Sequence, residues 1–351
     1  MKKKDIVLKL WRECFDDSDQ FVDMFFSRVY RDEDALVLDK DGRVVSSMLL
    51  QRYSMNFHGV TLPVSYICGA ATAPEMRAHG YMAELLSEGL NESYRRGDAF
   101  STLIPASGWL FKYYEKAGFS PVFYTCVEHF TSAHPFRHCG VYNAYTDIGS
   151  DEAYRFFNTM MEARPCCVQH TREQYHDIVM DNSVDGGSVL AVSDVDGVIA
   201  AMAFAVPDDG EVTVKELLAV DDDAANGVLS LVKETFGDMP MSVWRYFSPG
   251  VESSVRGMAR VVNVGLVLST LAQSHPELKL SVRVHDRVIP ENCHIYVVKD
   301  CRCMVDDSRD AESLDYDVDV EVLTSILFGN EVTEKILEFP AVRPYISLML
   351  D

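Results

Sequence analysis

Apolar stripes spaced for helices alternate with short apolar runs spaced for strands over the first 130 residues. The aromatic and valine residues within 21–30 recur every three or four positions, which places them on one face of a helix. Residues 35–38 and 44–50 are rich in β-branched and aliphatic residues and flank the turn sequence Asp39-Lys40-Asp41-Gly42. They therefore predict a β-hairpin.

A second apolar run, over residues 64–73, ends at Pro74 and predicts a buried strand. A long helix opens at Gly80, carries Met82, Leu85, Leu86, Leu90 and Tyr94 on one broad stripe, and closes near residues 95–97. A strand at 100–104, a short helix at 110–116 and a strand at 122–127 complete this first unit.

The same order of elements returns, more weakly, after a short helix at 154–161. Residues 188–192 and 198–204 flank a second Asp-Gly turn, at Asp194-Val195-Asp196-Gly197, and are followed by a strand at 212–220 and an apolar helix. Repetition in the same order indicates an internal duplication. From about residue 253 the pattern changes to a helix (261–271), strands (278–284, 295–298) and terminal helices (322–328, 332–339), which predicts an α+β domain.

Length and charge narrow the possible functions. The 351 residues suffice for two or three domains, and we expect them at 1–131, 132–252 and 253–351. The net charge of −22 argues against binding to nucleic acid or to an anionic membrane, and it suits a cationic or amine-bearing ligand. The alternative is that the acidity only maintains solubility.

No apolar run reaches the ~20 residues of a membrane span, and the nine cysteines are an odd number. We therefore expect a cytoplasmic protein with reduced thiols.

Residues 72–82 carry the most informative candidate chemistry. A strand ends here and a tight loop becomes the start of a helix, so that several backbone N–H groups and the positive end of the helix dipole point at one place. Such a loop favours a phosphate, Gly80 allows close approach, and Arg77 adds a charge for a diphosphate. An ordinary strand-to-helix turn is the alternative.

No metal site is expected, because the possible zinc ligands of the third domain lack the usual zinc spacing: Cys293, His294, Cys301 and Cys303.

Two motifs carry a family resemblance. Arg77-x-x-Gly80-x-Met82 after Ala-Thr-Ala-Pro, together with Phe111-Lys112-Tyr113-Tyr114-Glu115-Lys116-Ala117-Gly118-Phe119, resembles the GNAT superfamily of N-acetyltransferases. In that superfamily the first segment holds the pyrophosphate of acetyl-CoA. The resemblance implies that acetyl-CoA is the cosubstrate and that its contacts come from Ala70, Ala71, Thr72, Ala73, Arg77, Ala78, His79, Gly80, Tyr81 and Met82.

The three-domain organisation resembles the Eis family more specifically. The segments Gly257-Met258-Ala259-Arg260-Val261-Val262-Asn263-Val264 and Leu280-x-Val282-x-Val284-x-Asp286 look like its third domain, which is similar to sterol carrier protein. The resemblance implies two tandem GNAT-like mixed-sheet units (α/β) followed by a sterol-carrier-protein-like α+β domain. It also implies acetyl transfer to a primary amine of a small molecule or a peptide, and a homo-hexamer.

The resemblance assigns roles to three parts of the chain. It implies that main-chain N–H groups near residues 70–72 polarise the thioester carbonyl. It also implies that Tyr114 protonates the sulfur of CoA. The alternative role for Tyr114 is packing beside Tyr113. In the Eis family the C-terminal carboxylate serves as the base. Here the last residue is Asp351, whose side chain would add a second carboxylate to its α-carboxylate. The alternative is that Asp351 is only a solvated terminal residue. Ala78 and Met82 stand where the family usually has glycine or another small residue, which leaves a CoA- or lipid-binding oligomeric scaffold without catalysis as the alternative function.

The second unit differs at the equivalent loop. It has Asp221-Asp222-Asp223-Ala224-Ala225-Asn226-Gly227 where the first unit has the segment around Arg77. Three carboxylates repel a diphosphate, so the second unit is expected to bind no CoA.

Overall fold

The first unit begins with helices and continues as a mixed sheet. The computed structural model describes residues 2–184, 186–246, 250–329, 339 and 341–350. The elements of this unit are α1 (Lys3–Cys14), α2 (Asp19–Met24), a π-helical turn (Phe25–Val29), β1 (Ala35–Lys40), β2 (Arg43–Phe57), β3 (Val60–Thr72), α3 (Tyr81–Arg96), β4 (Phe100–Leu103), α4 (Gly108–Glu115) and β5 (Ser120–Phe130). The predicted hairpin is β1–β2, and the predicted long helix is α3.

The second unit repeats the order of two helices, three strands, a long helix and a strand, with an added strand before each of the first two helices, which supports the duplication. It comprises β6 (Asn143–Tyr145), α5 (Asp151–Glu162), β7 (Cys166–Gln169), α6 (Arg172–Val184), β8 (Ser188–Ser193), β9 (Ile199–Asp208), β10 (Glu211–Ala219), α7 (Asp222–Phe236) and β11 (Met241–Arg245). In both units the strand before the long helix pairs in parallel with the strand after it, β3 with β4 and β10 with β11. A parallel pair needs such a crossover helix, so α3 and α7 occupy equivalent places.

One sheet joins the two units, and a strand from the start of the third predicted domain lies inside it. β11 pairs with β5, and β12 (Ser253–Val261) is inserted between β4 and β5. This strand was not predicted, and the helix expected at 261–271 is α8 (Val264–Ser274) instead. Asn263 sets that start, because its side chain accepts a hydrogen bond from the Leu266 N–H.

The third unit packs α8 and α9 (Val320–Leu327) on a small mixed sheet. Its strands are β13 (Leu280–His285), β14 (Ile295–Lys299), β15 (Arg302–Val305) and β16 (Tyr316–Asp319), in the order β15-β14-β13-β16. An α+β unit is thus confirmed, whereas most of the helix predicted at 332–339 falls outside the described residues. Within the described ranges, the chain has no helix of the length and apolarity that a membrane span requires.

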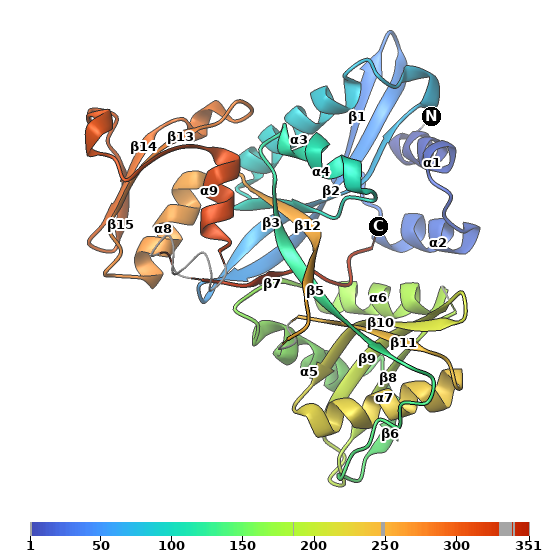
Figure 1. Cartoon of the computed structure of the whole chain (residues 1–351). Coiled ribbons are helices and arrows are strands. Elements are labelled where there is room, and N and C mark those ends of the chain that lie inside the picture. The colour runs from blue at the N-terminus through green and yellow to red at the C-terminus, as the bar shows by residue number, and fades with distance from the viewer. Residues whose placement is uncertain (1, 185, 247–249, 330–338, 340, 351) are drawn as a thin grey trace.

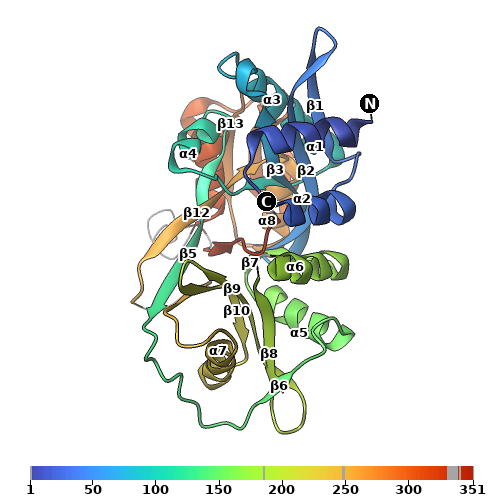
Figure 2. The same ribbon diagram turned by 90° about the vertical axis from the view of Figure 1, so that its right-hand side faces the viewer.

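The C-terminal segment runs between the first and second units, as the red trace in Figures 1 and 2 shows. Its strand β17 (Pro344–Tyr345) pairs in parallel with β7, and residues 344–350 are all buried. The buried Glu216 carboxylate accepts hydrogen bonds from Arg164 Nη1 (3.0 Å) and Nη2 (2.7 Å) and from Ser347 Oγ (2.6 Å). The Arg164 guanidinium also lies over the Tyr345 ring, 4.7 Å from its centroid. The second unit therefore holds the described C-terminal segment through β17 and Ser347.

Candidate active site

A cavity of about 780 Å³ lies where β3, α3 and α4 meet α1. Its wall includes nine of the twelve residues proposed from the sequence: Ala70, Ala71, Thr72, Arg77, Ala78, Gly80, Tyr81, Met82 and Tyr114. Ala73 is buried behind it, and His79 is exposed beside it, stacked on Tyr81 with ring centroids 5.5 Å apart. Asp351 lies outside the described residues.

β3 opens the cavity by separating from β4. The two strands pair only over Val64–Tyr66 and Phe100–Thr102, whereas β3 continues to Thr72. The Ala73 N–H donates to Val45 O on β2 (3.0 Å), and successive strand residues point to opposite edges, so the Thr72 N–H is directed toward the edge that faces away from β2. The splayed strand predicted at residues 70–72 is therefore present in the structure.

A bulge at Gly69 and Ala70 bends β3 at the inner end of the cavity. Leu49 pairs with Cys68 and Ser47 with Ala71, which leaves the two intervening β3 residues opposite Met48 alone. Gly69 has φ +57°, and a Cβ atom there would lie 2.3 Å from the Trp11 ring. Trp11 thus lines the cavity because residue 69 is glycine, a contact that the sequence pattern did not indicate.

The N-terminus of α3 presents backbone N–H groups to the cavity. Its N-cap residue, Gly80 (φ +81°), has no side chain that could cap the helix, and residues 80–83 line the cavity. Arg77 Nε donates to Thr72 O (3.2 Å), which holds the loop against the end of β3. An uncapped helix start beside an arginine suits an anionic group such as a diphosphate.

The N-terminus of α7, the counterpart of the start of α3, is capped by the acidic side chain of Asp221. Asp221 Oδ1 accepts from the Ala224 N–H (2.8 Å) as the N-cap. The Asp223 carboxylate accepts from the N–H groups of Cys139 and Gly140 (2.7 and 2.8 Å), and these bonds lower the pKa of Asp223. An N–H group at the start of α7 is thus bonded to the Asp221 carboxylate, whereas the start of α3 has no side-chain cap.

Tyr114 lies near the end of α4, and its buried ring packs between Tyr113 and Phe119, with centroids 5.4 and 5.9 Å away. Burial raises the pKa of Tyr114 to about 12, with a smaller contribution from Tyr113. The hydroxyl forms no hydrogen bond within the described part of the chain, and the residue lines the cavity. It is therefore a neutral donor at physiological pH.

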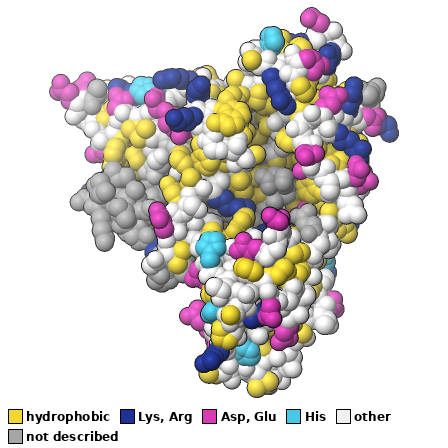
Figure 3. Space-filling model, turned by 45° about the vertical axis from the view of Figure 1, so that its right-hand side comes forward, with side chains coloured by type: hydrophobic (Ala, Val, Ile, Leu, Met, Phe, Trp, Pro, Cys, Tyr) yellow, Lys and Arg dark blue, Asp and Glu magenta, His cyan; other side chains and the backbone are white. Residues whose placement is uncertain are grey.

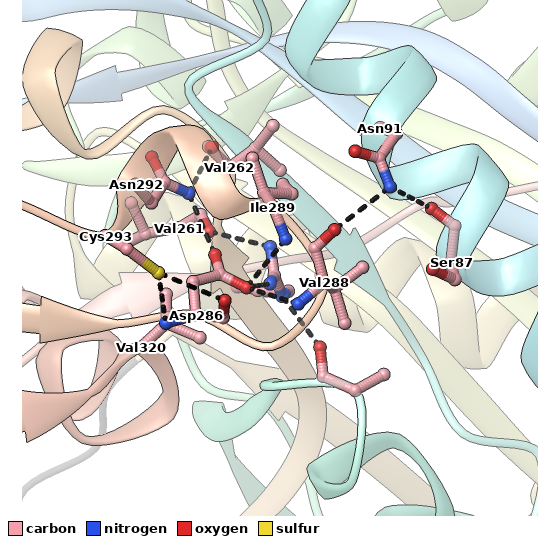
Figure 4. Close-up of polar contacts among 12 residues, drawn as sticks. Ser87, Asn91, Val261, Val262, Asp286, Val288, Ile289, Asn292, Cys293 and Val320 are labelled. Atoms are coloured by element: carbon pink, nitrogen blue, oxygen red, sulfur yellow. Dashed lines mark hydrogen bonds and ion pairs between the residues drawn. The ribbon is translucent and has the colours of Figure 1, made fainter.

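A buried ion pair supports the turn that follows Tyr114. Arg260 Nε donates to Ala117 O (2.7 Å), and its Nη2 donates to Asp286 Oδ1 (2.5 Å). Asp286 also accepts from the N–H groups of Val288 and Ile289 (both 2.9 Å) and from the Asn292 side chain, as Figure 4 shows. The ion pair thus connects the turn after α4 to the third unit. Gly118 cannot carry a side chain here, because a Cβ atom would lie 2.9 Å from Arg260 Nε.

A second cavity, of about 360 Å³, shares Asp17 with the first. Asp17 Oδ2 accepts from Trp11 Nε1 (2.7 Å). Asp16, Asp181, Lys215 and Arg256 add charged groups to this second cavity, and Leu348 and Met349 bring the C-terminal segment to it. The C-terminal segment therefore forms part of the wall of the second cavity. Neither Asp17 nor Trp11 belongs to a recognisable motif, so the sequence pattern gave no signal for them.

On the face shown in Figure 3, lysine and arginine side chains are scattered among acidic ones and form no extended basic patch. Across the described residues, no group of three or more His, Cys, Asp or Glu side chains is placed to hold a metal ion. The four candidate zinc ligands of the third unit do not come together.

Comparisons with known proteins agree with this geometry. Residues 2–122 match the model of the acetyltransferase (GNAT) domain family. The fold is similar to a GCN5-related N-acetyltransferase from Anabaena variabilis (TM-score 0.78, 14% identity, covering 98% of this chain and 97% of that one). It is also similar to one from Kribbella flavida (0.72, 17%, 99% and 95%) and to Eis1 from Mycobacterium abscessus (0.71, 12%, 96% and 90%). No curated protein matches by sequence. Residues 2–122 therefore form an acetyltransferase (GNAT) domain, and the chain as a whole has a fold similar to that of Eis1.

Proposed function

We propose that this chain transfers an acetyl group from acetyl-CoA to a primary amine of a cationic small molecule or a lysine side chain. One observation carries the proposal. A single cavity brings together the uncapped N-terminus of α3, the unpaired edge of β3 and the hydroxyl-bearing Tyr114. These are the donors that a diphosphate, a polarised carbonyl and a leaving thiolate require.

Bound acetyl-CoA supplies the thioester, and groups of the chain would bind the cosubstrate, polarise its carbonyl and protonate the leaving sulfur. Arg77 and the N–H groups of residues 80–83 would hold the diphosphate, and the outward N–H of Thr72 would polarise the carbonyl. Tyr114 would give its proton to the sulfur as the C–S bond breaks. Because burial keeps its pKa near 12, the hydroxyl is protonated throughout the physiological range.

The acceptor amine would enter through the second cavity. Its ammonium group would meet Asp17 where the two cavities adjoin, and it must lose a proton before it attacks. The C-terminal carboxylate of Asp351 is the base that we propose. Leu348 and Met349, which line the second cavity, support this role because they lie three and two residues before Asp351. Direct transfer needs no covalent enzyme intermediate.

Turnover tests the proposal. Purified protein would be incubated with acetyl-CoA and, separately, with polyamines, aminoglycosides and lysine peptides, while free thiol and acetylated amine are both measured. We expect thiol release that depends on the amine and equals the amide formed. Tight CoA binding without amide formation from any amine would instead support the non-catalytic scaffold.

Replacement of Arg77 tests the diphosphate site separately from catalysis. The Arg77→Gln variant is expected to raise the Kd of acetyl-CoA about tenfold, because a charge-assisted hydrogen bond contributes roughly 1.5 kcal/mol. Calorimetric titration measures this, and the Arg95→Gln variant, at the far end of α3, is the matched control. An unchanged Kd in Arg77→Gln would remove Arg77 from the site.

A further inference from the structure

Arg256 lies in the wall of the second cavity and has no polar partner among the residues that the structure describes. Within the described chain its guanidinium forms no hydrogen bond and no ion pair, and its Nε atom is buried without a partner. The guanidinium lies over the ring of Trp244, 4.0 Å from the centroid. In a chain with 54 acidic and 32 basic residues, most arginines near a carboxylate would be paired, so an unpaired one in a cavity calls for an explanation.

The backbone directs Arg256 into this place. Val255 pairs with Tyr124 and Gly257 with Phe123, so Arg256 is the extra residue of a bulge in β12. Bulges redirect side chains and are common beside active sites. Gly257 permits the bulge to pack tightly, because a Cβ atom there would lie 3.0 Å from Leu103 O and 3.2 Å from Ile346 Cγ2.

The stacked guanidinium is suited to an anion. A planar guanidinium held against an aromatic ring loses little conformational freedom when it binds a carboxylate or phosphate with two parallel hydrogen bonds. Leaving a buried N–H unsatisfied costs about 1–3 kcal/mol, which a bound anion would recover. Lys215, Asp16 and Asp181 line the same cavity, while Asp17 lies at the end that adjoins the first cavity.

We propose that the acceptor carries an anionic group as well as its amine, and that Arg256 binds the anion while Asp17 receives the ammonium group. This inference rests on the proposed acetyl transfer and specifies its substrate class. It favours amino acids and other zwitterionic amines over acceptors that carry only positive charge.

Paired acceptors test the inference. Lysine and 1,5-diaminopentane differ only in the carboxylate, and O-phosphoethanolamine and ethanolamine differ only in the phosphate. In the wild type we expect kcat/KM to be about tenfold or more higher for the anionic member of at least one pair, and the responding pair identifies the anion. In Arg256→Gln the KM of that acceptor should rise about tenfold with kcat little changed, its uncharged counterpart should be unaffected, and Arg256→Lys should restore part of the loss.

The outcomes separate this inference from the proposed function. The Arg302→Gln variant, exposed on β15, controls for loss of one arginine. If the wild type acetylates 1,5-diaminopentane and ethanolamine without preferring either anionic partner, the inference fails while acetyl transfer stands. If Arg256→Gln lowers kcat equally for both members of a pair, Arg256 acts on the reaction itself or on the chain's own C-terminal carboxylate, which also overturns it. If thiol is released at the same rate in the absence of any amine, the chain hydrolyses acetyl-CoA rather than transferring its acetyl group. That result would overturn the proposed function.

Discussion

The Tyr114→Phe variant is expected to lower kcat by about 100-fold while the Kd of acetyl-CoA stays within about twofold of the wild-type value. Only the hydroxyl is removed, and the ring still packs against Tyr113 and Phe119. General acid groups typically contribute 10²–10⁴-fold, and binding of the diphosphate does not involve this hydroxyl. Steady-state kinetics with saturating acetyl-CoA and calorimetry would measure the two effects separately.

The pH dependence sharpens this expectation. Since burial raises the pKa of Tyr114 to about 12, the neutral acid persists as the pH rises, and its loss should not limit kcat below about pH 11. The Tyr124→Phe variant, which alters an exposed tyrosine on β5, should match the wild type. A Tyr114→Phe enzyme with undiminished kcat would assign Tyr114 to packing, the alternative that the sequence left open.

The Glu216→Gln variant is expected to lower the free energy of unfolding by about 3–5 kcal/mol, because it leaves the Arg164 guanidinium buried without its counter-charge. Burial opposes the charge on Arg164, yet the Glu216 carboxylate raises the pKa of that group above its ordinary value. The variant also weakens the hold on Ser347, so residues 344–350 should exchange amide hydrogens faster. Urea denaturation and hydrogen exchange measure the two effects.

A double variant separates charge from packing. Arg164→Met combined with Glu216→Leu removes both charges and should cost less than Glu216→Gln alone. As a control, Glu13→Gln breaks an exposed pair with Lys9 (3.8 Å) and should change the free energy of unfolding by less than about 1 kcal/mol. Equal, small effects from Glu216→Gln and Glu13→Gln would show that the buried pair does not anchor the C-terminal segment.

Local patterns predicted much of the first unit. The Asp-Gly turn and the flanking β-branched residues are enough for the β1–β2 hairpin, and Gly80 marks the start of α3 because its positive φ disfavours other residues. The motif around Tyr114 placed the candidate acid on α4. Each of these features is determined by residues close together in sequence.

The features that the sequence did not indicate depend on pairing between segments that are far apart in the chain. The segment Ser253–Val261 pairs with β4 and β5, which lie more than 120 residues earlier, so its place in the large sheet has no local signal. Asp17 lines both cavities and Arg256 lines the second one because the loop after α1, β12 and the C-terminal segment meet there. The bulge that directs Arg256 depends on the register with β5, which hydrophobic periodicity does not reveal.

Hydrogen exchange of the full chain with and without acetyl-CoA tests most directly that the cavity of the first unit is the acetyl-CoA site. We expect slower exchange on binding in residues 69–83 and 104–114, which line this cavity. We expect unchanged exchange in residues 219–227 at the start of α7, where Asp221 caps the helix and Asp222 and Asp223 add negative charge. Protection at 219–227, or no protection at 69–83 under saturating acetyl-CoA, would contradict the account.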